Sequence, residues 1–525
     1  MIRPVDLKDD DVWTMFQASW TGDLGQVKGL VSRRRELALC EYNYTPPIHF
    51  AVREGHLELV RFLLEQGADP TYRTYPFQDT LLMMARDREH HEIAQLLLEI
   101  LARKFPVTEG VAGFLDAARR GDLPRLQSEL ARDPSLAVAS DDTGDTALHQ
   151  AAIGGHLPAI HVLLDAGANA EAVRADGKRP IDCALDRRNR TALRAGVLAG
   201  TLLARRAAYN IYLAAVIGDE DYVREALAAD PALSNFEDSS HQRPISAAAR
   251  RNDLEMVELL LAHGADPSLP EEGAPLGRAL WVSVYQKQPE MAKLLLEHGA
   301  NPNTAPESSG PAIMHARKDP QLRALLLQYG AREEMSDRKE LETLIGDNAL
   351  DEVEKLLQKH AELAQDSLSF WGEGILSGPA NSGNREMIEL LIRYGARVPE
   401  VSKWAPYYYF KHTEIAGLLL ERGMNPNHMN WHHFTLLHHM AAEGDIPKAR
   451  LLLDHGADIN TIDEEYRSTP LGCAARRGQK QMVELLLERR ADPNRAGAPW
   501  ATPLAWARKK GHSEIEGMLR QSGAE

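Results

Sequence analysis

One short pattern recurs along the whole chain, and its clearest copy is STPLGCAARRGQKQMVELLLERRADPN, residues 468–494. We expect Thr469 to cap a short helix and Pro470 to take its first position, where a missing N–H costs nothing. Gly478 is expected to end this helix in a left-handed turn, and a second helix with an apolar leucine stripe follows. Two helices this short cannot bury their apolar faces alone, so each copy needs a neighbour on either side.

The pattern predicts a repeat array of about sixteen copies. Thr435, Thr469 and Thr502 open the last three copies at a step of roughly 33 residues. Earlier copies are recognised at residues 45–70, 145–169 and 243–267, among others. A chain of 525 residues is also too long for one hydrophobic core, which independently favours an array or several domains.

The TPLH-like opening, the glycine between the two helices and the LLL-x-x-G-A-D-P-N closing resemble the ankyrin repeat family. The resemblance covers about residues 11–525. It implies an all-α solenoid of about sixteen helix–turn–helix repeats, joined by short β-hairpin or loop fingers. In this family the fingers and the first helices form a concave surface. The resemblance implies little about function, because one repeat scaffold can hold many different partners.

Four repeats close differently from the others. The first, fourth, seventh and eleventh carry RRELAL, RDPSLAV, ADPALSN and KHAELAQ in place of the GADPN ending. Because the same variant recurs, we predict four sub-arrays, at residues 1–110, 111–206, 207–335 and 336–525. The alternative is one smooth solenoid whose repeats have drifted.

The last repeat has the composition of a cap. Its second helix places Glu516 and Arg520 where the preceding repeat has Val483 and Leu487. Nothing further is expected to stack on these charges, and the chain is expected to be complete at its C-terminus.

Composition argues against two classes of partner. The formal net charge is −16, whereas a nucleic-acid-binding protein normally has a basic face. No apolar run reaches membrane-spanning length, and the start MIRPVDLKDDD is acidic where a signal peptide would be basic. The three cysteines are far apart and show no metal-ligand spacing. We therefore expect a cytoplasmic protein that binds neither nucleic acid nor membrane.

The sequence lacks the motifs of common catalytic sites. It has no phosphate-binding G-x-x-x-x-G-K-[ST] loop, no dinucleotide-binding glycine motif after a strand, no H-E-x-x-H and no G-x-S-x-G. We predict that the protein is not an enzyme, has no catalytic residues and uses no cofactor.

A histidine cluster, NHMNWHHFTLLHHMA, is the strongest candidate for a metal site. Such a set could bind zinc or nickel if the loop folded back. Against this, His438 stands at the TPLH histidine, for which the family resemblance implies structural hydrogen bonding. Neighbouring helical residues such as His438 and His439 also point in different directions. We therefore predict no metal site, and expect structural or partner-contacting histidines that could make binding pH-sensitive. The cluster comprises His428, His432, His433, His438 and His439.

Large aromatic residues precede the repeat openings in the last sub-array. Trp371, Trp431, Tyr466 and Trp500 each stand two to four residues before an opening position, which places them in fingers. Trp281 stands at the TPLH histidine position and should also face the concave side. Exposed aromatic rows are typical binding anchors, so these five are the predicted partner-binding residues. The alternative is that the rings pack on neighbouring fingers and stiffen the array. A weaker aromatic series in the first fingers comprises Tyr42, Tyr44, Tyr72, Tyr75 and Phe77.

The charge is uneven along the chain. Residues 1–206 carry roughly −3, residues 207–430 roughly −13 and residues 431–525 about zero, which sums to −16. An acidic groove would attract a basic protein segment, although the charge can also serve the solubility of a long array.

These observations predict a non-catalytic scaffold that binds a protein or peptide, possibly basic, on its concave face. A second hypothesis is a metal- or small-molecule-sensing protein that uses residues 404–439, where WAPYYYF replaces the usual small alanine pair. The partner's identity and the oligomeric state do not follow from the sequence.

Overall fold

A computed structural model of the protein describes residues 1–108, 110–185, 198–202, 209–238, 240–306, 310–317, 319–332 and 336–525. The regular elements in these ranges are helices, and the fingers between them contain isolated β-bridges such as the one joining Met429 and Thr435. The prediction of an all-α repeat fold is confirmed. The chain divides into two compact units, Met1–Leu98 with Met335–Glu525, and Glu99–Glu334.

The clearest sequence repeat folds as its residues predict. The Thr469 side chain accepts a hydrogen bond from the Gly472 N–H at the start of helix α29 (Pro470–Arg477). Gly478 ends this helix with a φ of 73°, in the left-handed region. Helix α30 (Lys480–Glu488) follows and buries Met482, Val483, Leu485 and Leu486. Local capping signals and the apolar stripe therefore specify the helix pair.

Alanines in the first helix allow neighbouring repeats to approach closely. Ala474 and Ala475 of α29 are fully buried, and α29 packs between α27 (Leu436–Glu443) and α31 (Pro503–Lys510). Small side chains let three helices in a row pack backbone to backbone, while the leucines of the second helices fill the outer layer.

The first unit contains three N-terminal helix pairs and six C-terminal pairs within its described residues. We call residues 1–98 the N-terminal repeats and residues 336–525 the C-terminal repeats. The N-terminal helices are α1 (Asp10–Thr21), α2 (Leu24–Arg33), α3 (Pro47–Glu54), α4 (Leu57–Glu65), α5 (Leu81–Asp87) and α6 (His91–Ala102). The other C-terminal helices are α21 (Asp337–Gly346), α22 (Leu350–Lys359), α23 (Ser377–Ser382), α24 (Arg385–Arg393), α25 (Ala405–Tyr408), α26 (Thr413–Glu421), α28 (Ile446–Asp454) and α32 (Ser513–Gln521).

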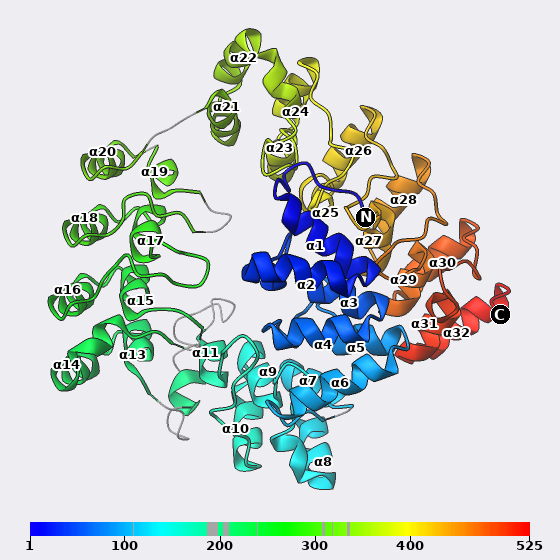
Figure 1. Ribbon diagram of the computed structural model, residues 1–525, viewed down its shortest axis with the longest axis horizontal. Helices are drawn as coiled ribbons and strands as arrows, with labels where there is room; N and C mark the ends of the chain where they lie inside the picture. Colours follow the sequence, from blue (N-terminus) through cyan, green and yellow to red (C-terminus); the bar gives the residue numbers. More distant parts are fainter. Residues whose placement is uncertain are drawn as a thin grey trace. The chain divides into compact units, whose positions relative to one another are not determined.

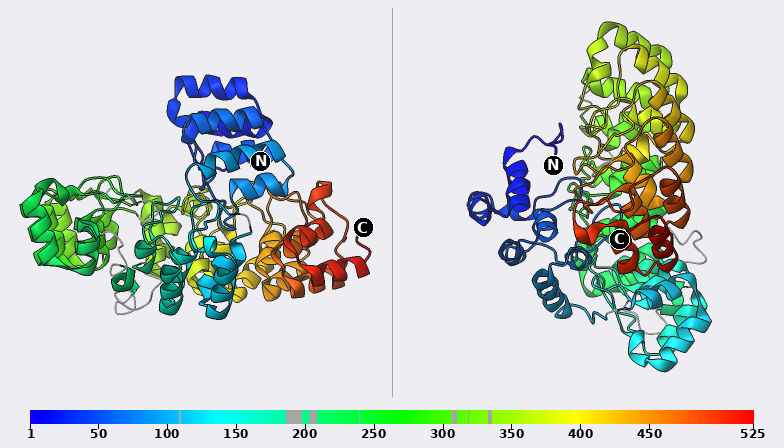
Figure 2. Two further views of the ribbon diagram at one scale, coloured as in Figure 1. Left: turned by 90° about the horizontal axis from the view of Figure 1, so that it is seen from below. Right: turned by 90° about the vertical axis from the view of Figure 1, so that its right-hand side faces the viewer.

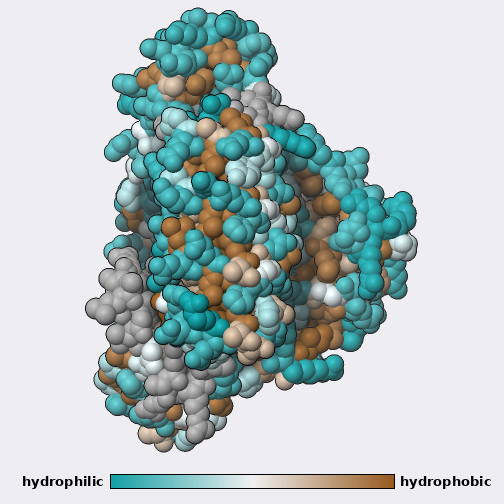
Figure 3. Space-filling model, turned by 90° about the vertical axis from the view of Figure 1, so that its left-hand side faces the viewer, coloured by the Kyte–Doolittle hydropathy of each residue, from teal (hydrophilic) through white to brown (hydrophobic). Residues whose placement is uncertain are grey.

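The second unit repeats the same arrangement. In Figure 1 the first helices α13, α15, α17 and α19 form one row, and the second helices α14, α16, α18 and α20 form another. The space-filling view of Figure 3 shows an apolar strip bordered by hydrophilic side chains along the outer row. The helices are α7 (Ala112–Arg120), α8 (Leu123–Arg132), α9 (Ala147–Gly154), α10 (Leu157–Asp165), α11 (Pro180–Ala184), α13 (Ile211–Ile217), α14 (Glu220–Ala229), α15 (Pro244–Arg251), α16 (Leu254–Ala262), α17 (Ala279–Tyr285), α18 (Pro289–Glu297), α19 (Ala312–His315) and α20 (Pro320–Gln328).

The four variant repeat endings share one conformation, a 3₁₀ helix that follows the second helix. A standard ending turns instead at a glycine with positive φ, such as Gly264 at 88°. The variants lack this glycine, and in two of them an aspartate caps the 3₁₀ helix: Asp133 accepts from the Ser135 N–H and Asp230 from the Ala232 N–H. These helices are η1 (Arg35–Leu39), η2 (Pro134–Ala137), η3 (Pro231–Asn235) and η4 (Ala361–Gln365); a fifth, η5 (Pro499–Ala501), lies in the last finger.

Separate hydrophobic clusters lie along the array. One contains buried residues from Leu341 to Ala524, a second from Ile211 to Ala331, and a third from Val111 to Leu213. The division into four sub-arrays stays a prediction, as does the boundary within 186–208, much of which lies outside the described residues. In the part of the chain that the structure describes, no helix is long and apolar enough to cross a membrane.

The N-terminal repeats form a short stack of their own beside the C-terminal repeats (Figures 1 and 2). A small apolar cluster joins the two, since Leu7, Phe16 and Phe50 pack with Trp431. The side of the C-terminal repeats that they meet carries the fingers, which is the concave side expected for partner binding.

Candidate functional site

Trp431 is the apolar centre of the contact between the N-terminal and C-terminal repeats. Its side chain is 1% exposed, and its ring lies 5.3 Å from that of Tyr42, 5.9 Å from Phe50 and 6.0 Å from Phe16. The Ile2 N–H donates to the Trp431 carbonyl oxygen at 3.1 Å. This predicted anchor therefore contacts repeats of its own chain.

Tyr466 is held in a buried, charged network. Its hydroxyl donates to Asp79 Oδ2 at 2.8 Å, and the Arg476 guanidinium lies 2.9 Å from the same oxygen and 3.2 Å from Asp87 Oδ2. Arg476 also lies over the Tyr466 ring, 4.6 Å from its centroid. Burial, with the Asp79 charge adding to it, raises the pKa of the Tyr466 hydroxyl well above its usual value, so the hydroxyl stays a donor.

Trp500 and α31, which is the first helix of the last repeat, contact the third N-terminal repeat. The Arg88 guanidinium lies 5.1 Å from the Trp500 ring centroid, within cation–π range. Lys509 donates to the Asp87 carbonyl oxygen at 2.7 Å, and Lys510 pairs with the Asp87 carboxylate at 2.8 Å. Basic residues at the end of α31 therefore fix an acidic turn of the N-terminal repeats.

Glu465 lies at the centre of a cluster of buried basic groups. Its Oε2 atom lies 3.1 Å from His49 Nε2, 3.3 Å from His432 Nδ1 and 3.4 Å from Arg53 Nη1. Arg88 donates to the Glu465 carbonyl oxygen at 2.6 Å. Burial opposes ionisation of this carboxyl, but the two imidazoles and Arg53 outweigh it and hold the Glu465 pKa well below its usual range.

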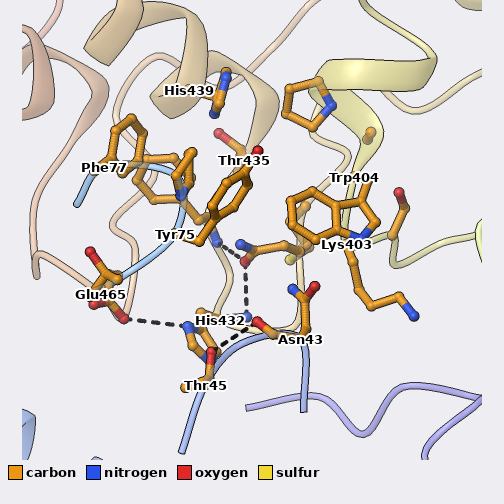
Figure 4. Close-up of a pocket in the computed structure, with 18 of the residues that line it drawn as sticks. Asn43, Thr45, Tyr75, Phe77, Lys403, Trp404, His432, Thr435, His439 and Glu465 are labelled. Carbon is orange, nitrogen blue, oxygen red and sulfur yellow. Dashed lines mark hydrogen bonds and ion pairs between the residues drawn. The ribbon is translucent and has the colours of Figure 1, made fainter. Parts of the chain in front are cut away.

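The same cluster lines a pocket with aromatic walls. The pocket has a volume of about 80 Å³, enough for a few water molecules. Figure 4 shows the rings of Tyr75, Phe77 and Trp404 on one side, with His432 and Glu465 on the other. Tyr75 packs edge-on against Trp404 at 4.9 Å between ring centroids. The aromatic residues of the first fingers and those of the 404–439 region thus face one another.

Two predicted anchors lie outside this contact. The Trp371 side chain is 58% exposed, with Lys339 Nζ 5.9 Å from its ring centroid, although its backbone carbonyl oxygen accepts a hydrogen bond from Lys403 Nζ at 2.8 Å. Trp281 on α17 is half-buried; its indole N–H donates to the Gly310 carbonyl oxygen at 3.1 Å, which places it on the finger side of the second unit. It stacks on Tyr285 at 4.9 Å, and Tyr285 is 57% exposed.

The histidines of the 428–439 cluster have separate surroundings. His438 Nδ1 lies 2.7 Å from Thr435 Oγ1 and its Nε2 lies 3.2 Å from the Ser468 carbonyl oxygen, the structural role that the family resemblance implies. His433 pairs with Glu464 at 2.8 Å. Of the five, His432 alone joins a group of three potential metal ligands among the described residues, together with His49 and Glu465.

Sequence reasoning missed half of this surface. It singled out Trp431, Tyr466 and Trp500, but gave no role to their respective partners in the first repeats, Phe50, Asp79 and Arg88. The aromatic series Tyr42 to Phe77 was the available signal, because two sets of aromatic fingers in one chain can bind each other. Whether the predicted anchors also bind another protein stays a prediction.

Comparison with known proteins identifies the repeats. The family model described as ankyrin repeats (3 copies) matches residues 15–106, 211–306, 380–463, 404–497 and 437–525, and a second ankyrin repeat model, described as many copies, matches 148–195.

Similar proteins include two named ubiquitin ligases and a named palmitoyltransferase. The E3 ubiquitin-protein ligase XBAT33 of Arabidopsis thaliana is 35% identical over 155 residues, which cover 24% of this chain and 30% of that protein. The probable E3 ubiquitin-protein ligase XBOS32 of Oryza sativa subsp. japonica is 29% identical, with coverage of 31% and 40%. The palmitoyltransferase ZDHHC13 of Mus musculus is 30% identical, with coverage of 27% and 23%.

The chain spans less than half the length of each of these relatives, so the activities in their names belong to those whole proteins. The family models, by contrast, match well over half of this chain and agree with its stacked helix pairs. The chain belongs to the ankyrin repeat family.

Proposed function

We propose that the protein is a non-catalytic scaffold that binds a protein or peptide on the concave face of the second unit, where Trp281 and Tyr285 are the anchors. Ankyrin repeats are protein-interaction modules, which supports the general role. The observation that carries the location is the stacked Trp281–Tyr285 pair, whose exposed ring lies beside a finger. A rigid aromatic surface gives contact area at low entropic cost.

Two further observations support a basic partner. Residues 207–334 hold 19 acidic and 11 basic residues, a net charge of −8. In the first unit, basic residues of the C-terminal repeats already pair with acidic residues of the N-terminal repeats, for example Lys510 with Asp87. An acidic surface around an aromatic anchor would accelerate the binding of a basic segment, and high salt would weaken this binding.

None of the three cysteines forms a disulfide, which fits the proposed cytoplasmic location.

Affinity capture with the full-length protein tests this proposal. The wild type, a W281A/Y285A variant and the matched control L327A are compared, since Leu327 is an exposed apolar residue of the outer-row helix α20. A partner retained by the wild type and by L327A but lost by W281A/Y285A supports the concave site. Equal capture by all three proteins would contradict it.

The pocket favours a second candidate function, the sensing of a small ligand by residues 404–439. Trp404, Tyr407 and His439 of this region line the pocket together with residues of the N-terminal repeats. A ligand bound there would bridge the two sets of repeats and alter their contact. Titration of the purified protein distinguishes this function from the scaffold, because no protein partner is needed.

A further inference from the structure

We propose that His49, His432 and Glu465 form a binding site for a divalent transition-metal ion, for which Zn²⁺ is the natural probe. The proposal deepens the second candidate function and does not depend on the scaffold function. It rests on three side chains that come from different repeats, lie close together and line one pocket.

Two of the three distances between the ligand atoms match a tetrahedral metal centre, and all three atoms lie within 4.8 Å of one another. The distances from Glu465 Oε2 to His49 Nε2 and to His432 Nδ1 are 3.1 and 3.3 Å. Ligands bound to zinc at about 2.0–2.1 Å in tetrahedral geometry are separated by about 3.3–3.4 Å. Two imidazoles with one carboxylate is also a ligand set that zinc uses when a fourth position stays open. Here the pocket supplies that position, since all three residues line it.

Metal binding requires both rings to turn a lone pair toward the ion. Each ring now donates to Glu465, and among the described residues the other nitrogens, His49 Nδ1 and His432 Nε2, have no hydrogen-bond partner. When an ion binds, the proton that now lies between each ring and Glu465 moves to this far nitrogen, where the buried N–H lacks an acceptor, and this cost lowers the affinity for the ion. The rings are already stacked, with 5.8 Å between centroids and an angle of 20° between planes.

Two buried guanidinium groups, those of Arg53 and Arg88, oppose metal binding, and a second carboxylate moderates the effect of Arg53, which is the one in contact with the Glu465 carboxylate. Its Nη1 atom approaches Glu465, but its Nε atom pairs with Glu54 Oε1 at 2.8 Å. Arg53 thus keeps a carboxylate partner when Glu465 binds an ion. The remaining positive charge lowers the affinity for any cation, so we expect weaker binding than in a structural zinc site with cysteine ligands.

Zinc titration of the full-length, EDTA-treated protein tests the site. Isothermal calorimetry, with metal content measured after dialysis, is applied to the wild type, H432Q, E465Q and the control H433Q. His433 is the adjacent histidine and pairs with Glu464, outside the proposed ligand set. We expect one Zn²⁺ per chain for the wild type and H433Q, and loss of that binding in H432Q and E465Q.

Hydrogen exchange keeps the proposal testable if a variant folds poorly. Because His49 lies in α3 and the other two ligands in fingers of the C-terminal repeats, bound zinc should slow exchange in both segments of the wild type together. Absence of saturable zinc binding to the wild type, or equal loss in H432Q and H433Q, would overturn the proposal. Either failure leaves the scaffold function intact, since that is tested by protein capture.

Discussion

His149 shows at residue scale how the TPLH histidine stabilises a repeat. Its Nδ1 atom lies 2.8 Å from Thr146 Oγ1 and its Nε2 lies 3.1 Å from the Lys178 carbonyl oxygen, so one ring connects a helix start to the next finger. The ring is fully buried, and burial with the nearby charge of Arg174 lowers its pKa to about 4. The folded repeat therefore requires neutral His149.

This requirement predicts acid sensitivity in α9. Below a pH of about 6.5 the unfolded chain binds a proton that folded His149 does not, so the stabilising contribution is complete above pH 6.5 and is lost as the pH falls toward 4. The full loss is about 3 kcal/mol. Hydrogen exchange in α9 should show an opening free energy that falls from pH 7.5 to 5.0 more steeply in the wild type than in H149Q. Parallel slopes would show that His149 does not titrate in this range.

The burial of Arg476 leads to a second prediction, which concerns the free energy of unfolding. It is 6% exposed and pairs with Asp79 and Asp87 while packing between Tyr466 and Trp506. R476M would leave Asp79 buried beside fewer cations, and we expect a loss of about 3–5 kcal/mol in the free energy of unfolding. Chemical denaturation measures it. The control R489M removes an exposed pair with Asp454 and should cost less than about 1 kcal/mol; similar losses in both variants would contradict the argument.

At the scale of the element, the alanine pair of the first helices sets how closely repeats stack. Ala474 is fully buried in α29, with α27 on one side and α31 on the other. A474L should separate these helices and cost about 1–3 kcal/mol through overpacking. The control K480L places the same side chain on the exposed start of α30. Thermal unfolding compares them, and equal melting temperatures would show that the inter-repeat spacing tolerates a larger residue.

The whole first unit depends on contacts between residues far apart in the sequence. Asp79 of the N-terminal repeats accepts a hydrogen bond from the Tyr466 hydroxyl and pairs with Arg476 of the C-terminal repeats. Asp87 pairs with Arg476 and Lys510. The D79N/D87N variant should weaken the contact between the N-terminal and C-terminal repeats by about 3 kcal/mol. The equilibrium constant for opening of this contact should then rise on the order of 100-fold. Faster hydrogen exchange in α5 and in residues 463–467 would report it. D454N, at an exposed pair, serves as the control, and unchanged exchange in the double variant would contradict the prediction.

At the scale of the whole molecule, the predicted anchors of the C-terminal fingers serve a contact within the chain. Trp431, Tyr466 and Trp500 have the composition and placement expected of a binding surface, and in the structure they contact the first repeats of the same chain. A second protein that used this face would have to displace those repeats. This is why the proposed partner site lies on Trp281 and Tyr285 instead.

The sequence by itself determined the helix pairs and their order. Thr469, Pro470 and Gly478 act on backbone within a few residues, and the alanine and leucine stripes act between adjacent repeats, so each signal lies within one or two copies of the pattern. The endings without glycine were recognisable in the sequence as a recurring variant, but their 3₁₀ conformation was seen only in the structure.

Only the tertiary structure decided which surfaces meet. Tyr466 and Asp79 are 387 positions apart, and His49 and Glu465 are 416 apart. No local backbone signal encodes such a pairing. The pairing depends on the small rotation between each repeat and the next, summed over many repeats until two distant faces meet. The aromatic fingers and the histidine cluster were visible as residue types. Their partners, and the convergence of His49, His432 and Glu465, follow from that long-range packing.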